Sequence, residues 1–462
     1  MKPKYFLALG LLVLGLGSCG ESFFEQYPSN NITEGNFYKT DDDFNQGVVA
    51  CYAKLKTQMS FHLTEIGYRG DENVLESMAV STQNRYDIDH FAETANNGIL
   101  NDIWNAWYNG IYRCNDVLDH MTGAKIANYD KYRGECLFLR SWWYFNLYRV
   151  FGVVPITRTV VTPAAAKLIP RCTEEEMYTL LTEDLAEAAR LLPDTRNAEK
   201  ARVTGIAAYT LLAKVYLTFG KHAEARTALD EAMKATGYGL ESTTKRVFDI
   251  NNKMNKEVIF ALYYNKTNDN GHGYWYSANT DVLADINNPT PTFKAIYDSE
   301  KDNRLPLISS YTKIKDNLFA MTKWYDTYDA TYTTQVGNDF PHLRYADVVL
   351  MYAEALAESG GSLGDALEWL NKTRTRAGLD ELTTDEVKSL AEFRRELAAE
   401  RGREFALEGH RWFDLVRLGL AVDYFREMGY SLDSHNLIFP IPQNQIEIVN
   451  NPSILWQNPG FN

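Results

Sequence analysis

Apolar residues recur every three or four positions along most of the chain, which is the spacing of one face of an α-helix. Between 101 and 120 they are Ile103, Trp104, Trp107, Ile111, Val117 and Leu118. The segment 132–151 is apolar on nearly every side, so we expect a helix buried on more than one face and ended by Gly152 and Pro155. Further helices are predicted over 174–192 and from about 384 to about 409.

Three aspartates precede a helical pattern near the start of the chain. Asp41, Asp42 and Asp43 follow Thr40 and come directly before the apolar series Phe44, Val48 and Tyr52. Carboxylates in a first helical turn cap the backbone and favour the helix dipole, so we expect a helix N-terminus here. A Ca²⁺ site is the alternative interpretation of the same three residues.

Two segments have the spacing of small and large residues found in tetratricopeptide (TPR) helix pairs. The first comprises Leu212, Ala213, Tyr216, Gly220, Ala225 and Ala232; the second comprises Ala353, Leu356, Gly360, Ala366 and Leu370. The two copies lie about 140 residues apart, which excludes a plain tandem solenoid. The sequence therefore predicts helix pairs that are separated by a long irregular region.

That region spans roughly 237–340 and is rich in Asn, Asp, Gly, Thr and Tyr, with weak periodicity. A short strand is predicted over 258–264. Long loops inside a compact protein are usually functional, so we expect the region to carry function. An extended tail is predicted to begin at 440–442.

The first residues have the features of a bacterial lipoprotein signal peptide. Lys2 and Lys4 precede an apolar run over 5–17, which is too short to span a bilayer, and the run ends in Leu-Gly-Ser before Cys19. We expect residues 1–18 to be removed and Cys19 to be lipidated, with 19–462 forming one domain. The alternative is an ordinary signal peptide beside a chance cysteine. No later stretch is long and apolar enough to cross a membrane.

Charge and cysteine spacing exclude several classes of function. Cleavage before Cys19 removes two lysines and no acidic residue, which takes the net charge from −14 to −16 and argues against nucleic acid as a partner. The other cysteines are Cys51, Cys114, Cys136 and Cys172, without the CxxC spacing of zinc or thioredoxin sites. The first three fall in helical patterns and are expected to be small core residues.

Six segments resemble the sequence of a known family, in the same order along the chain. They are 37–43 (similar to NFY.T..D), 140–155 (RA..YF.L...FGGVP), 344–355 (RYAD…LMYAEA), 371–379 (LN..R.RAGL), 400–419 (ER..EFA.EG.RWFDL.R), and a terminal element at 440–442 and 457–460. The sequence departs slightly from these patterns at Trp142 and Trp143 and in reading FGVVP. Together with the lipobox, the segments identify the chain as similar to the SusD/RagB family of outer-membrane nutrient-binding lipoproteins.

The resemblance implies a mostly α fold in which four TPR-like helix pairs form a scaffold and a loop-rich half binds the ligand. It also implies a lipid-anchored protein at the outer membrane that faces the cell exterior. Its partner would be a SusC-like TonB-dependent transporter, to which it delivers captured glycans. A RagB-like role in peptide capture is the alternative.

The matched motifs are expected to be structural. Arg401, Glu404, Glu408, Arg411 and Asp414 have the three- and four-residue spacing of ion pairs along and between helices. An unrecognised glycosidase would have to use two of these carboxylates as acid and base, and their sequence setting isolates no such pair. Zinc-protease, serine-hydrolase and nucleotide-binding motifs are absent. We therefore predict no catalytic residues, no cofactor and no metal.

Ligand binding is expected in the unmatched loops, where aromatic platforms and polar side chains can meet a sugar ring. Two stretches have this composition. The candidates are Tyr274, Trp275 and Tyr276 in the second stretch (271–276), and Arg69, Asp71, Tyr86 and Asn96 in the first (68–97). Local packing is the alternative interpretation of each. For Trp324, which follows Lys323, packing is the expected role.

Overall fold

The computed structural model describes residues 37–72, 83–194, 201–267, 277–279, 289–315, 318–326 and 337–461. Cys19 and the candidate aromatic residues Tyr274, Trp275 and Tyr276 lie outside these ranges. The fold is mostly helical, as predicted. Within the described ranges, no helix has the combination of length and hydrophobicity that crossing a bilayer requires.

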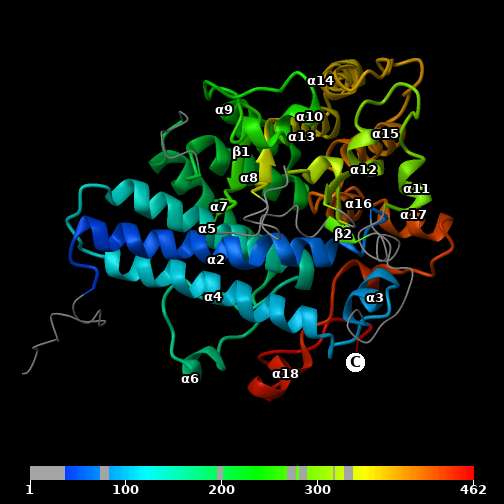
Figure 1. The fold of residues 1–462 in the computed structure, drawn as a ribbon. Helices are drawn as coiled ribbons and strands as arrows, with labels where there is room; N and C mark the ends of the chain where they lie inside the picture. The colour runs from blue at the N-terminus through cyan, green and yellow to red at the C-terminus, as the bar shows by residue number, and fades with distance from the viewer. Residues whose placement is uncertain are drawn as a thin grey trace, which may run out of the picture.

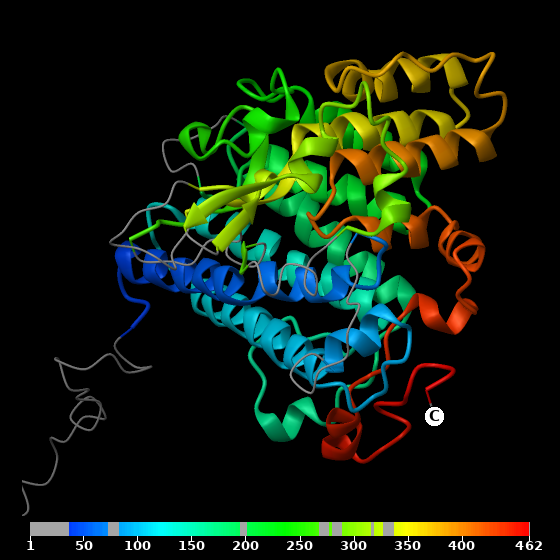
Figure 2. The same ribbon diagram turned by 45° about the vertical axis from the view of Figure 1, so that its right-hand side comes forward.

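Three long helices lie side by side in one layer of the molecule (Figures 1 and 2). They are α2 (Asp41–Gly67), α4 (Gly98–Met121) and α5 (Tyr129–Phe151), and α2 packs against both of the others. The helices predicted over 101–120 and 132–151 are thus confirmed. Helix α5 is buried on more than one face, as expected, and Gly152, with a φ of +71°, ends it.

The start of α2 is a capped helix N-terminus, as expected, and Asp43 is the aspartate that takes part in the cap. The Thr40 side chain accepts a hydrogen bond from the backbone N–H of Asp43, and the Asp43 carboxylate accepts one from Thr40 in return. Asp41 accepts hydrogen bonds from the side chains of Asn128 and Tyr132. In the part of the chain that the structure covers, no group of three or more His, Cys, Asp or Glu residues could hold a metal ion.

The remaining long helices pack in succession onto the first layer. In order they are α7 (Glu174–Leu191), α8 (Gly205–Thr218), α9 (His222–Ala232), α13 (Tyr345–Glu358), α14 (Leu363–Arg376) and α15 (Leu390–Glu404), and each contacts the next. The turns within the pairs α8–α9 and α13–α14 contain Gly220 and Gly360, whose positive φ favours glycine. The helix pairs are confirmed, and because α9 packs on α13, the two copies are neighbours in space. Their assignment to TPR repeats stays a prediction.

Two boundary predictions were wrong. The helix expected to span about 384–409 covers only Leu390–Glu404, because Ser389 caps its N-terminus together with Glu392 and the chain turns after Phe405. The C-terminal tail, expected to be extended, contains the helix α18 (Gln443–Val449) directly after Pro442. Proline fixes a φ that suits the start of a helix as well as extended chain.

Short elements and two small sheets make up the rest. Strand β1 (Val258–Leu262), predicted from the sequence, pairs antiparallel with β5 (Phe340–Arg344); β2 (Ser277–Asn279), β4 (Leu318–Met321) and β3 (Tyr311–Lys315) form an antiparallel sheet in the order β2-β4-β3. The short helices are α3 (Gln83–Asp89), α6 (Pro163–Ala166), α10 (Thr244–Val247), η2 (Ile250–Asn252), α11 (Pro291–Lys294), α12 (Leu305–Ser309), η4 (Thr322–Trp324), α16 (Arg411–Arg417), α17 (Ala421–Glu427) and η5 (Ser434–Leu437). Cys51, Cys114 and Cys136 are buried free thiols in the helical core, as expected.

Candidate functional site

A buried ion network joins the loop-rich region to the helical scaffold. The Arg344 guanidinium, 1% exposed, donates hydrogen bonds to Glu408 at 2.7 Å, to Glu257 at 2.6 Å and to Glu404 at 2.9 Å. Lys323 reaches Glu408 at 2.7 Å, and Trp324 beside it is buried, which confirms the packing role expected for this pair.

The other motif residues are paired in the same way. Arg304 and Arg376 contact Glu404 at 3.1 and 2.5 Å, Arg401 contacts Asp414 at 2.8 Å, and Arg411 contacts Asp71 at 2.9 Å. The scaffold network predicted from the spacing is therefore confirmed.

The network leaves its carboxylates unsuited to acid–base catalysis. Arg376, Arg344 and Arg304 hold the pKa of Glu404 far below its usual value despite its burial, and arginines also lower the pKa of Glu400. A glycosidase acid must keep its proton near neutral pH and reach the substrate. Glu404 and Glu400 are fully buried and remain ionised, so neither can play that role.

Arg69 and Asp71 lie inside the protein with partners from distant segments. Arg69 is fully buried; it pairs with Glu93, and its guanidinium lies over the rings of Phe91 and Phe439 at 4.6 and 4.3 Å. Asp71 is 2% exposed and accepts hydrogen bonds from Arg411 and Tyr424. In this structure both residues fix the chain after α2 to the C-terminal helices, and neither side chain faces solvent.

Tyr86 and Asn96 lie nearer the surface. Tyr86, on α3, is partly buried and stacks on His90 with ring centroids 3.8 Å apart. Asn96 is exposed, and its neighbour Asn97 donates a hydrogen bond to the Asn84 carbonyl, which ties the segment to α3. Of the candidates that the structure describes, these two can contact a ligand without a change of fold.

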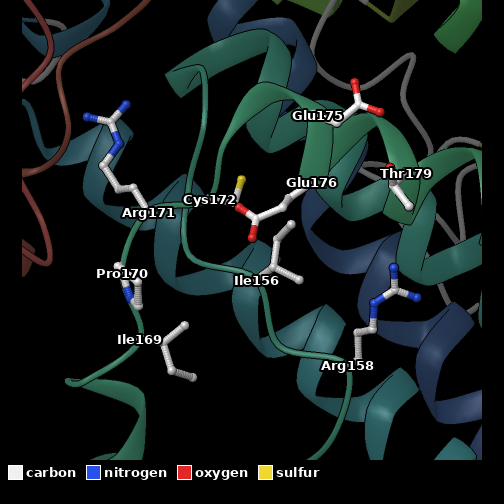
Figure 3. Close-up of a pocket in the computed structure, with 9 residues that line it drawn as sticks. All are labelled: Ile156, Arg158, Ile169, Pro170, Arg171, Cys172, Glu175, Glu176 and Thr179. Atoms are coloured by element: carbon white, nitrogen blue, oxygen red, sulfur yellow. The ribbon is translucent and has the colours of Figure 1, made fainter.

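A surface pocket of about 440 Å³ lies between the chain at 156–158, the chain at 169–172 and the first turns of α7 (Figure 3). Glu176, which lies beside Cys172 in the figure, is committed to capping α7 through Thr173. Burial raises the pKa of the Cys172 thiol to about 11, so it is not a thiolate nucleophile at neutral pH. Neither Glu176 nor Cys172 is therefore poised for catalysis.

A neighbouring groove of about 370 Å³ shares Ile169 with this pocket and runs between α4, α6 and α18. Both views show α6 and α18 on the same side of α4 (Figures 1 and 2). Five exposed apolar side chains line the groove or are adjacent in the sequence to its lining residues: Tyr112, Val160, Leu168, Ile448 and Trp456. They are 38–72% exposed, and we call them the apolar face. Only two other large apolar side chains are exposed among the described residues. Tyr112 and Ile448 line the groove itself, and the other three are adjacent to lining residues in the sequence. Exposed apolar side chains around a groove make it a candidate interaction surface.

Sequence reasoning missed this face because its residues come from three distant segments and follow no period. One available signal was Leu168, a large apolar residue in a Pro- and Ala-rich segment that shows no helical pattern.

Comparisons with known proteins place the fold among described relatives. Residues 27–217 match the family described as "Starch-binding associating with outer membrane", and residues 300–461 match the one described as "SusD family". SusD-like protein P2 of Formosa agariphila is 26% identical, over 99% of this chain and all of the relative. Starch-binding protein SusD of Bacteroides thetaiotaomicron is 25% identical, over 76% of each chain.

Solved structures have the same fold. A SusD superfamily protein from Bacteroides vulgatus superposes with a TM-score of 0.77 at 23% identity, covering 92% of this chain and all of that one. Surface glycan-binding protein A from B. thetaiotaomicron, in complex with laminarihexaose, superposes with a TM-score of 0.75 at 21% identity, covering 91% and 99%. With both ends of the sequence matched by family descriptions and the helical fold shared throughout, the chain belongs to the SusD/RagB family.

Proposed function

We propose that the protein is a lipid-anchored, non-enzymatic binding protein of the outer membrane that captures oligosaccharides at the cell surface and passes them to a SusC-like TonB-dependent transporter. The observation that carries the proposal is the match of residues 27–217 to a family described by starch binding and outer-membrane association. Relatives named for starch and laminarin binding support the same ligand class.

The ligand site is proposed in the loops outside the six motif segments rather than in the scaffold. Trp275, flanked by Tyr274 and Tyr276, is assigned as the stacking platform, and Tyr86 and Asn96 are assigned as further ligand contacts. A sugar presents an apolar face and a rim of hydroxyls, which an aromatic ring and amide side chains can each meet. Arg69 and Asp71 serve this site indirectly by anchoring the segment that follows α2.

The N-terminal side of the molecule is proposed to face the membrane. The Tyr38 hydroxyl donates a 2.8 Å hydrogen bond to Asp116, and its ring stacks on His120, so the chain enters the fold at the C-terminal end of α4. The 18 residues from Cys19 to 36 can span at most about 65 Å. Lipidation at Cys19 therefore keeps the C-terminal part of α4, which carries Tyr112, within that reach of the membrane.

We assign the apolar face to the transporter because a partner embedded in the same membrane lies within reach of this tether. Contact with the face would bury side chains such as Leu168, which is 72% exposed. Ordinary apolar burial yields about 25 cal/mol per Å², which gives the contact a driving force without ion pairs.

A glycan and peptide array tests the ligand class. The secreted part of the chain, lacking residues 1–19, is applied to neutral oligosaccharides, acidic oligosaccharides and peptides. Binding to one family of oligosaccharides with no signal on peptides is the expected result. Binding to peptides alone would replace glycan capture with the RagB-like alternative, and release of shortened glycans would contradict the non-enzymatic role.

A further inference from the structure

A second pocket, of about 320 Å³, lies within the helical scaffold between the end of α5, α8, α16 and the chain at 437–438. Its lining includes Arg149, Lys214, Thr218, Phe413, Asp414 and Ile438. None of these residues belongs to the candidate loops at 68–97 or 271–276. Its volume is at the lower end of the range for small-molecule sites.

Arg149 is the unusual residue of this pocket. Its guanidinium lies between the rings of Phe145 and Phe413, at 4.6 and 4.0 Å, and donates one hydrogen bond to the Asn146 side chain. The Nε atom is buried without a hydrogen-bond partner. Arg149 forms no ion pair within the described structure, whereas the other cations of the pocket do.

The other cations of the pocket belong to one connected series of ion pairs. Lys214 pairs with Asp347, which contacts Arg401 at 2.9 Å; Arg401 contacts Asp414 at 2.8 Å; and Asp414 contacts Arg417 at 2.9 Å. Arg417 also pairs with Glu354. The cluster thus holds three carboxylates and, with Arg149, four cations. His410 adds no charge, because burial and the nearby Lys214 hold its pKa well below the usual value.

Burial makes the excess positive charge of this cluster energetically unfavourable. Burial lowers the pKa of Arg149 to about 9 and that of Lys214 to about 8, although acidic neighbours act in the opposite direction. A partly buried cation without a counter-ion is unfavourable, and a carboxylate is the group that a guanidinium binds best. Phe413, Leu437 and Ile438 offer an apolar wall beside it.

We propose that this pocket binds a small carboxylate-bearing ligand of monosaccharide size, with the carboxylate on Arg149 and the body of the ligand against Phe413 and Ile438. Two kinds of ligand carry such a carboxylate. A uronic acid suits a protein that captures glycans, and a free organic acid is the alternative. The pocket shares no residue with the proposed loop site, so failure of this proposal leaves the proposed function intact.

The test is calorimetric titration of the full-length protein in detergent with glucuronate, glucose and acetate. Glucuronate is expected to bind at least about tenfold more tightly than glucose, because a hydrogen bond between a guanidinium and a carboxylate is stronger than one between neutral groups. Arg149→Gln should lose that preference. Arg113→Gln, which removes an exposed arginine on α4 outside the pocket, is the matched control and should keep it.

A second variant guards against a misfolded Arg149→Gln protein. Thr218→Glu places a carboxylate within the pocket lining and should abolish glucuronate binding without lowering the melting temperature. Equal binding of acetate and glucuronate would keep the carboxylate site and assign it to free organic acids. Glucuronate binding that is no tighter than glucose binding, or that survives both variants, would overturn the proposal.

Discussion

The Nε atom of Arg344 donates a 2.7 Å hydrogen bond to Oε2 of Glu408, and neither side chain is more than 1% exposed. Arg344 stands at the junction of β5 and α13, and Glu408 follows α15 in the chain. This pair joins the loop-rich region to the scaffold, so the position of the loops depends on a charge contact within the core.

Removing Arg344 should therefore destabilise the whole fold. Arg344→Met leaves Glu257, Glu404 and Glu408 without their shared guanidinium, and a broken buried pair costs about 3–5 kcal/mol. Urea unfolding followed by circular dichroism measures the change. Arg426→Gln, which breaks an exposed pair with Asp423 on α17, is the control and should leave the midpoint nearly unchanged. Equal midpoints for Arg344→Met and the control would refute the structural role of the network.

Close packing of α4 on α5 gives a second prediction. A Cβ atom added at Gly110 would lie 2.7 Å from Cζ2 of the fully buried Trp143, closer than any ordinary contact. Gly110→Ala should thus cost about 1–3 kcal/mol through overpacking, despite the better helix propensity of alanine. Thermal unfolding checks this, with Gly239→Ala as the control because an added Cβ there meets nothing within 4 Å. A variant as stable as wild type would show that the two helices are farther apart than described.

Glu72 should make stability depend on pH. Burial, with a smaller contribution from Asp71, raises the pKa of its carboxyl from the ordinary 4.5 to about 8. Between these two values the folded protein holds a proton that the unfolded chain has released, so this contribution to stability is complete below pH 4.5 and is lost as the pH rises towards 8.

Glu72→Gln removes this dependence, because its amide stays neutral at every pH. Relative to wild type, the variant should gain roughly 2–4 kcal/mol of stability between pH 5 and pH 8. Urea midpoints at the two pH values provide the measurement, and the exposed Glu300→Gln is the control. If the difference in urea midpoint between wild type and Glu72→Gln were the same at both pH values, Glu72 would be ionised in the folded protein.

The lipid anchor and the apolar face can be tested together in cells. Cys19→Ala should release the protein from the membrane, and retention at the wild-type level would contradict the anchor.

The double variant Leu168→Ser/Ile448→Ser tests the apolar face. It should remain in the membrane, but less of the TonB-dependent transporter should co-purify with it. Val49→Ser, at an exposed apolar position on α2 outside the face, is the matched control. Unchanged recovery of the transporter would move the contact elsewhere.

The sequence predicts the scaffold well because periodic apolar residues and closely spaced charges are local signals. The long helices α4 and α5 follow from such spacing, and so does the expectation that Arg401 and Glu408 form ion pairs. The partners themselves do not, since Arg344 lies 64 positions from Glu408. Sequence reasoning could not recognise that Asp71 is a core residue, because its partner Arg411 lies 340 positions away. The apolar face and the Arg149 pocket were missed for the same reason, since each forms only when distant segments fold together.

The central claim is that an aromatic platform in the loops captures an oligosaccharide. The most direct measurement is calorimetric titration of wild type and Trp275→Ala with the oligosaccharide that gives the strongest array signal, together with both melting temperatures. We predict that Trp275→Ala binds too weakly to measure while its melting temperature stays unchanged. A millimolar affinity corresponds to only about −4 kcal/mol, and the aromatic contact contributes about 1 kcal/mol of that in addition to the burial of the ring. Full binding by a well-folded variant would contradict the account, and so would a loss of about 3–5 kcal/mol in stability, which marks a core residue.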